Sequence, residues 1–241
     1  MQSEVLLRKT TRREFRQRMA AGELQACLLP VAAIEQHLEH LAMEHDWHSC
    51  VYVATLVAER LRPHVLVAEG LMAGISEHHM KHPGTLSLSP ASFLAVLGDM
   101  IDSMVRAGFT NIVVLNGHGG NIVPCRAVWD QFVRRFQVNL HFLPYWDVLT
   151  VDDARELLDS GSVLPKNLPG HAQEFETSFA LAAFPENVRT DMWTDQPDPT
   201  PAMATAEKGE AFIERIVERV SQYVREMIDG QRVMEIPPFH P

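Results

Sequence analysis

The 241-residue sequence has few of the features that mark secreted and membrane proteins. Its three cysteines, Cys27, Cys50 and Cys125, are odd in number, widely spaced and set among apolar residues. That pattern is typical of buried thiols in a reducing compartment and not of a disulfide framework. No apolar run reaches the roughly 18 residues of a membrane span, and the first residues lack the apolar stretch of a secretory signal. We therefore expect a cytoplasmic protein with no membrane partner.

Positive charge is also scarce. Lysine and arginine number 21 against 31 aspartates and glutamates, which gives a net charge of −10. Nucleic-acid-binding proteins usually carry a basic surface, so nucleic acid is not expected as a partner. Apolar residues make up 46% of the chain, an ordinary share for a globular protein, and no change in composition marks a boundary. The sequence predicts a single domain over residues 1–241.

Several catalytic motifs are missing as well. The sequence contains no G-x-S-x-G, which argues against a serine nucleophile of the α/β-hydrolase type. It has neither H-E-x-x-H nor paired C-x-x-C, which argues against zincin peptidases and zinc ribbons. The glycine-rich segment 116–121, NGHGGN, matches neither the dinucleotide-binding fingerprint nor the phosphate-binding loop with its lysine.

Histidine, by contrast, is abundant. The chain has 12 histidines against 3 tyrosines, and 8 of the 12 lie between His37 and His82. Histidine is the commonest metal ligand and titrates near neutral pH, so this region is the first place to look for a site. Clustering by itself is also compatible with chance or with an exposed loop.

Short apolar runs alternate with amphipathic segments along the chain. Strands are predicted over residues 24–31, 64–68, 111–115 and 138–143. Helices are predicted from about 47 to 61, 90 to 107, 123 to 136, 151 to 158, 172 to 184 and 206 to 228, with Ser89 and Pro90 opening the second of them. Strands alternating with helices predict an α/β fold with a mostly parallel sheet covered by helices on both faces.

Four polar residues follow or flank the predicted strand ends. Glu35 and His37 lie just beyond the first strand and point to the same side if the chain is extended there. His118 lies just beyond the third strand, and ligands of such sheets bind at the carboxyl ends of the strands. Asp46 stands where the next helix should begin, so it is either a further metal ligand or a helix N-cap. A carboxylate and an imidazole side by side make half of a divalent-metal site.

A histidine and two glutamates, His171, Glu174 and Glu176, open a later predicted helix. Glutamates are favoured in a first helical turn by the helix dipole, so a structural reading is available for both. The same three residues also suit general acid–base work beside a metal ion.

Taken together, four blocks of sequence resemble the creatininase (creatinine amidohydrolase) family. The family shows P-x-G-S-x-E-Q-H-G-x-H-L-P followed by T-D, then E-H-x-x-F-P-G-T-x-S-L, N-G-H-G-G-N and H-A-G-E-x-E-T-S. The corresponding stretches here are residues 30–41 with Asp46, then 78–88, 116–121 and 171–178. Their order and separations over about residues 24–184 make the resemblance strong, although each block alone would be weak.

The resemblance implies a three-layer α/β sandwich that assembles as a hexameric homo-oligomer and hydrolyses a small-molecule amide. It implies two divalent ions, zinc, manganese or iron, and it makes Glu35, His37, Asp46 and His118 metal ligands, with Asp46 as the bridge. Creatininase itself binds its second ion with a glutamate at the position of Gly120. We expect Glu176, in preference to Glu174, to supply the missing carboxylate. His171 is then expected to handle a proton or polarise the amide carbonyl, and His171 or Glu174 to protonate the leaving nitrogen.

Some departures from the family pattern bear on the substrate. Leu38-Glu39 replaces the usual Gly-Pro, His82 stands where phenylalanine is usual, and the loop 161–170 lacks the tryptophan that creatininase places over its substrate. Trp146 is a candidate aromatic wall or a core residue, and His40 and His79 are candidate pocket residues. The alternatives are a peptide-trimming or deformylating relative in cofactor biosynthesis, and a metal-binding member without catalytic activity.

Overall fold

A four-stranded, all-parallel sheet lies at the centre of the computed structural model, which describes residues 3–161 and 170–235. Its strands are β1 (Ala26–Val31), β2 (Val65–Val67), β3 (Asn111–Asn116) and β4 (Asn139–Pro144), in the order β2-β1-β3-β4. Every residue of β1 and β2 is buried, as expected for a parallel sheet with both faces covered. The predicted α/β fold with a mostly parallel sheet is confirmed.

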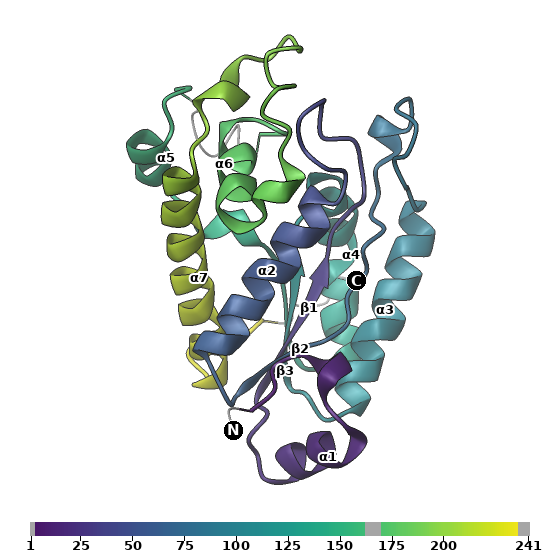
Figure 1. Ribbon diagram of the computed structural model, residues 1–241. Helices are drawn as coiled ribbons and strands as arrows, with labels where there is room; N and C mark the ends of the chain where they lie inside the picture. Colours follow the sequence, from purple (N-terminus) through teal and green to yellow (C-terminus); the bar gives the residue numbers. More distant parts are fainter. Residues whose placement is uncertain (1–2, 162–169, 236–241) are drawn as a thin grey trace.

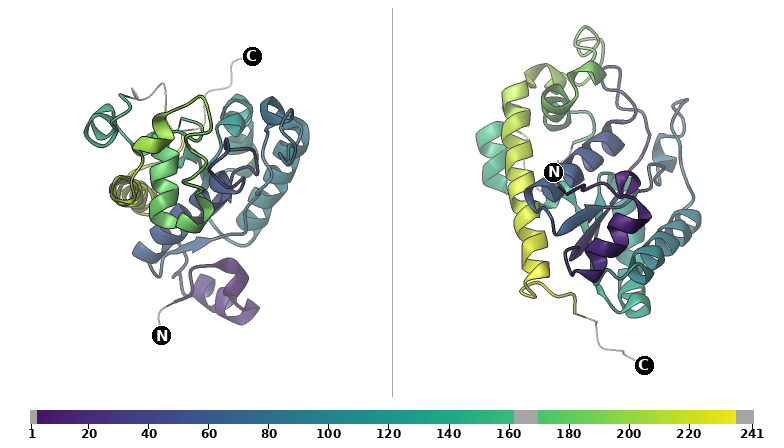
Figure 2. Two further views of the ribbon diagram at one scale, coloured as in Figure 1. Left: turned by 45° about the horizontal axis from the view of Figure 1, so that its top comes forward. Right: turned by 60° about the horizontal axis from the view of Figure 1, so that its bottom comes forward.

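Helices cover both faces of this sheet (Figures 1 and 2). They are α1 (Arg12–Ala20), α2 (His45–Arg60), α3 (Pro90–Arg106), α4 (Ile122–Phe136), α5 (Val151–Leu157), α6 (Glu174–Ala183) and α7 (Ala206–Ile228). The core on one face is built mainly from α2, α6 and α7, and the core on the other face from α3 and α4. The three predicted layers are therefore present within one domain.

The path of the chain explains which helix covers which face. From β1 the chain moves through α2 to β2, whereas α3 and α4 carry it in the opposite direction to β3 and then β4. Parallel strands joined by a helix cross over right-handedly, so a reversal of direction puts the helices on opposite faces. The reversal also makes the junction between β1 and β3 a topological switch point. Ligands bind at the carboxyl ends of the strands at such points.

Three segments meet at this junction. The chain leaves β1 through residues 32–43 and leaves β3 through the 3-10 helix Gly119–Asn121. The long connection after β2 returns to the same edge, because Leu71 pairs with Val31 and Leu86 pairs with Ile34. This connection carries a further 3-10 helix, Glu77–His79. Histidines far apart in the sequence therefore lie at one end of the sheet.

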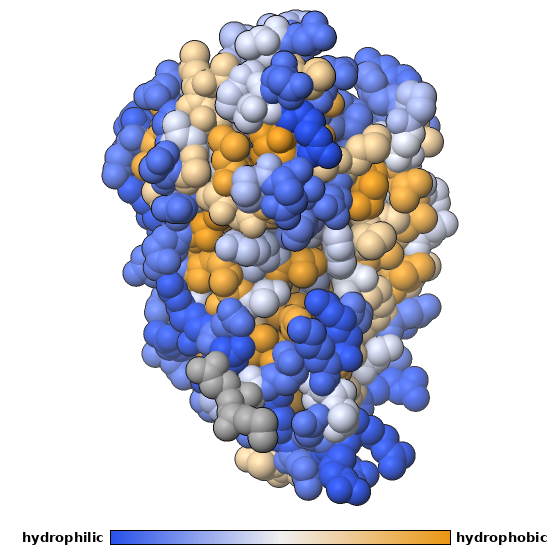
Figure 3. Space-filling model, in the orientation of Figure 1, coloured by the Kyte–Doolittle hydropathy of each residue, from blue (hydrophilic) through white to orange (hydrophobic). Residues whose placement is uncertain are grey.

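The surface is largely polar over α5 and α7, and apolar residues gather over the upper part of α3 (Figure 3). Large apolar side chains exposed in this part of the chain are Met72, Met80, Leu86 and Val96. Within residues 3–161 and 170–235, no helix combines the length and the apolar character needed to span a membrane.

Candidate metal centre

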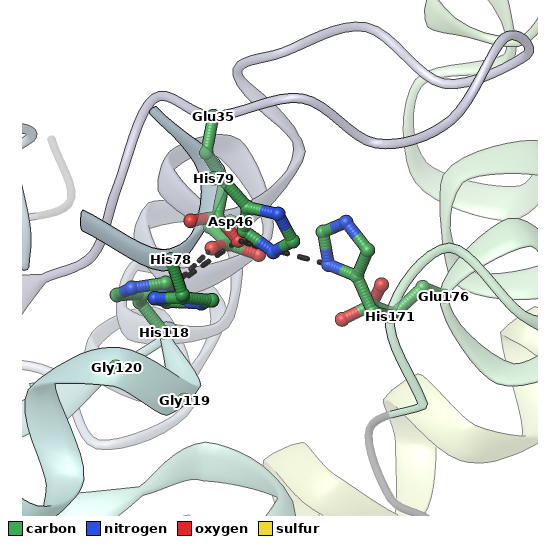
Figure 4. Close-up of a pocket in the computed structure, with 9 residues that line it drawn as sticks. All are labelled: Glu35, Asp46, His78, His79, His118, Gly119, Gly120, His171 and Glu176. Atoms are coloured by element: carbon green, nitrogen blue, oxygen red, sulfur yellow. Dashed lines mark hydrogen bonds and ion pairs between the residues drawn. The ribbon is translucent and has the colours of Figure 1, made fainter. Parts of the chain in front are cut away.

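A cavity of about 280 Å³ opens at the switch point between β1 and β3 (Figure 4). The residues that line it come from the segment after β1, from α2, from the long connection after β2, from the loop after β3 and from the start of α6. They are Glu35, Asp46, His78, His79, His118, Gly119, Gly120, His171 and Glu176.

Asp46 lies in the first turn of α2 and joins two histidines. Its Oδ1 lies 3.0 Å from Nε2 of His37, and its Oδ2 lies 2.8 Å from Nδ1 of His118. It is not the N-cap of α2, because that position belongs to Glu44. Burial opposes ionisation of Asp46, but the charges and hydrogen bonds of the two histidines outweigh it and hold the pKa of its carboxyl well below the usual range.

Both histidines are fixed at their other ring nitrogen by a backbone carbonyl. Nδ1–H of His37 donates to the carbonyl oxygen of Glu35 at 3.1 Å, and Nε2–H of His118 donates to that of Ile75 at 3.1 Å. Each ring therefore turns its other nitrogen toward Asp46. Metal-binding histidines are commonly oriented in this way, with the non-ligating nitrogen bonded to a backbone carbonyl or a carboxylate.

Two further carboxylates complete the cluster. Oε1 of Glu35 lies 3.4 Å from Nδ1 of His118, and its Oε2 has no hydrogen-bond partner among the described residues. Oε2 of Glu176 lies 3.7 Å from Nε2 of His37 and accepts a hydrogen bond from the backbone N–H of Ala172 at 2.6 Å. Burial raises the pKa of both carboxyls, that of Glu176 to about 8. Because Glu35 lies beside His118 and Glu176 lies beside His37, the two glutamates lie on opposite sides of Asp46.

The electrostatics of the cluster fit bound cations. Three buried carboxylates, Glu35, Asp46 and Glu176, form ion pairs only with histidines within residues 3–161 and 170–235. Burying charges without full compensation is costly, and the orphaned Oε2 of Glu35 adds to that cost. A mixed set of imidazole nitrogens and carboxylate oxygens suits zinc, iron or manganese. The residues present thus fit a divalent-metal centre.

His171 stands on the cavity wall and is oriented by Gln36. The Gln36 side-chain oxygen accepts from the backbone N–H of Leu38 at 3.0 Å, which turns its amide nitrogen toward Nε2 of His171 at 2.7 Å and Nδ1 of His79 at 2.9 Å. Because Gln36 donates to both rings, the proton of His171 lies on Nδ1, which faces Oε1 of Glu35 at 3.6 Å. Burial, with the charges of His37 and His79, lowers the pKa of His171 to about 3.

Glu174, named above as a candidate acid, does not line this cavity. Its carboxylate accepts hydrogen bonds from Nζ of Lys208 at 2.6 Å and from the backbone N–H groups of Asp159 at 3.0 Å and Ser160 at 2.8 Å. Helical residues two apart point about 200° away from each other, so Glu176 faces the cavity when Glu174 faces α7.

Other candidate residues lie outside the cavity. His40 is buried between Thr177, whose Oγ1 lies 2.8 Å from Nε2, and Gln196, so it ties the segment after β1 to α6. Trp146 packs in the core beside Tyr145. The loop 161–170 falls almost entirely outside the described residues.

The sequence patterns assign no role at the site to Gln36, which contacts His171, or to His78, which lines the cavity. The signal for His78 lay in the family pattern E-H-x-x-F-P-G-T, which has a glutamate where this chain has His78.

Comparison with known proteins agrees with the geometry. The family model for creatininase, described as creatinine amidohydrolase, matches residues 8–203. The chain belongs to the creatininase family. Creatinine amidohydrolase of Pseudomonas putida is 30% identical over 94% of this chain and 98% of its own length. A mutant creatininase of the Zn–Zn type superposes with a TM-score of 0.81 at 30% identity, covering 94% of this chain and 99% of that one. A manganese creatininase gives a TM-score of 0.82 at 28% identity and the same coverage.

Other relatives act on different molecules. A 3-dehydro-scyllo-inosose hydrolase of Thermotoga maritima is 28% identical over 79% of this chain and 60% of its own length. A mycofactocin precursor peptide peptidase of Mycolicibacterium smegmatis is 30% identical over 68% of this chain and 60% of its own length. The chain is thus a creatininase-family amidohydrolase, and membership of the family alone does not fix its substrate.

Proposed function

We propose that this protein is a divalent-metal-dependent amidohydrolase that cleaves a non-peptide C–N amide bond, cyclic or formyl, in a small molecule. The observation that carries the proposal is the arrangement around Asp46. Two histidines each turn a ring nitrogen toward a different oxygen of one buried carboxylate, and a further carboxylate lies at each end. This is the layout expected of a two-ion centre with Glu35, Asp46 and His118 at one end and His37, Asp46 and Glu176 at the other.

A pair of divalent ions bound there supplies a water molecule of lowered pKa and an electrophile for the substrate carbonyl. The protein groups have separate tasks. His37 and His118 are held rigidly by backbone carbonyls, which fixes the centre before substrate arrives. His171, neutral and protonated at Nδ1, donates a hydrogen bond to the substrate from the cavity wall. It thereby polarises the amide carbonyl or supports protonation of the leaving nitrogen.

The size of the cavity supports a small substrate over a peptide. At about 280 Å³ it lies at the lower limit of the roughly 300–1,000 Å³ of ligand pockets, which suits a compact molecule. Trp146 lies in the core, so among the described residues the cavity has walls of histidine and glycine instead of tryptophan or tyrosine. Creatinine is therefore one test substrate among several. The homo-oligomeric assembly and the cytoplasmic location stay predictions from the sequence.

The test is a hydrolysis screen of the purified protein loaded with zinc, manganese or iron. Substrates include cyclic amides, formamides, a short peptide and an inosose. We expect turnover of a cyclic or formyl amide, abolished in Glu35→Gln and His118→Ala proteins that retain the wild-type circular dichroism spectrum. Turnover of the peptide alone would assign the chain to the peptide-trimming branch. A protein that binds metal and hydrolyses none of them would favour the non-catalytic alternative.

A further inference from the structure

The end of the centre formed by Glu35, Asp46 and His118 has no room for a side chain from the glycine-rich loop. A Cβ added to Gly120 would lie 2.2 Å from the carbonyl oxygen of Ile75 and 2.5 Å from Nε2 of His118. Real Cβ atoms do not approach backbone oxygens this closely. The segment that includes Ile75 therefore closes over Gly120, and any additional donor for this end must come from elsewhere.

That segment also brings His78 to the same place. His78 lies in the 3-10 helix Glu77–His79, and its ring stacks on the ring of His118 with centroids 5.9 Å apart and an interplanar angle of 12° (Figure 4). Its Cε1 lies 3.1 Å from the position that a Cβ on Gly120 would take. One ring nitrogen of His78, one of His118 and an oxygen of Glu35 all lie within 4.8 Å of one another.

A carboxylate oxygen at this end of the centre also lacks a partner. Oε2 of Glu35 is buried without a hydrogen-bond partner among the described side chains and backbone groups. The carboxylate of Glu35 belongs to the same candidate ligand group as His78 and His118. At the other end, Glu176 adds a donor to His37 and Asp46. At the His118 end, His78 is the residue beside Glu35 and His118 that can add a donor in the same way.

We propose that His78 is an additional ligand of the ion held by Glu35, Asp46 and His118, at the end of the centre where Gly120 has no room for a side chain. The inference rests on the proposed two-ion centre and adds a residue to it. An imidazole at this position contributes no negative charge, whereas a carboxylate would. Imidazole suits zinc and iron, whereas carboxylates suit manganese, so this end of the centre prefers zinc or iron over manganese.

The experiment measures bound ions directly. Wild-type, His78→Ala and His82→Ala proteins are equilibrated with buffered free zinc, and bound zinc per chain is counted by mass spectrometry. His82 is the matched control, an exposed histidine on the same segment that belongs to none of the candidate ligand groups. Loss of outer-shell partners weakens metal binding about 10–100-fold, so loss of a ligand is expected to weaken one of the two zinc sites about 100-fold or more. Cobalt-loaded His78→Ala is also expected to show a changed visible absorption band.

A His78→Glu variant tests the same idea through metal preference. With a carboxylate in place of the imidazole, we expect two ions to remain bound and the zinc-over-manganese preference of one site to fall by about 10-fold or more. His78→Ala that binds both zinc ions with wild-type affinity and an unchanged cobalt spectrum would overturn the inference and leave the proposed function intact. A wild-type protein that binds no ion would overturn both.

Discussion

Two glutamates that stand two residues apart on α6 should respond to substitution in opposite ways. The carboxylate of Glu174 accepts three hydrogen bonds, one from the ammonium of Lys208, and that of Glu176 faces the metal centre. Replacing Glu174 by Gln removes the charge and leaves one oxygen to accept. We expect loss of one to two charge-assisted bonds, each worth about 1.5–3 kcal/mol, and hence a destabilisation of about 3 kcal/mol.

The destabilisation of Glu174→Gln can be measured as a fall in the midpoint of thermal unfolding. For a chain of this size 1 kcal/mol shifts the midpoint by roughly 2–4 °C, so Glu174→Gln should unfold about 6–12 °C below the wild type. Although burial opposes its ionisation, Lys208 and the two backbone N–H groups hold the pKa of Glu174 below its ordinary value of 4.5. Its stabilisation is therefore present above pH 4.5 and is lost as the pH falls, so the two midpoints should converge in acid.

The matched variant, Glu176→Gln, should lose bound metal and activity. Its metal-free form should unfold within a few degrees of the metal-free wild type, because Gln removes a buried carboxylate whose ionisation burial already disfavours. The reasoning would be refuted if Glu174→Gln kept wild-type stability and metal content yet lost turnover. That result would restore Glu174 as a catalytic acid.

Three further outcomes are expected. Gly120→Ala should destabilise the protein by about 1–3 kcal/mol in urea unfolding, because the added Cβ would lie 2.2 Å from the carbonyl oxygen of Ile75. Wild-type stability of this variant would contradict the close approach of Ile75 to Gly120. Asp153→Asn should cost about 3 kcal/mol at pH 7, because Asp153 is buried and bound by Arg219. Those contacts lower the pKa of Asp153, so the stabilisation from its charge is present above about pH 4. The difference in unfolding free energy between the wild type and Asp153→Asn should therefore become smaller on acidification. Gln36→Leu should lower kcat about 10–100-fold with metal content unchanged, because His171 loses the donor that sets its tautomer.

The strands and the long helices could be predicted because their signals are local. The short apolar runs at 24–31 and 111–115 are typical of buried strands, and both runs contain one. Ser89 as N-cap and Pro90 as the first helical residue mark the start of α3. Helix α7 has the predicted bounds, 206–228, since its apolar positions repeat with helical spacing throughout. Helices α2 and α6 begin two residues away from the predicted starts, and the other predicted bounds differ from the observed ones by at most two residues.

The site could be predicted only in part, since its remaining details depend on distant contacts. Residue type and strand-end position brought Glu35, His37, Asp46 and His118 together as candidates, and the structure places them in one cluster. The choice between Glu174 and Glu176 depends on the rotation of α6, which packing against α7 sets through Lys208. No local pattern carries that information.

His78 escaped prediction for the same reason. Its ring reaches the centre because the connection after β2 pairs with residues 31 and 34, far away in sequence. The short 3-10 helix Glu77–His79 suffices to place the ring of His78 against that of His118.

The proposed function requires a two-ion centre bridged by Asp46, and counting bound metal ions tests this most directly. Wild-type protein and Asp46→Asn are saturated with zinc, freed of excess metal and analysed by mass spectrometry, with circular dichroism as the check on folding. We predict two zinc ions per wild-type chain, and fewer than one in Asp46→Asn because both sites share its carboxylate. A wild-type chain without zinc, or an Asp46→Asn chain that keeps two ions, would contradict the account.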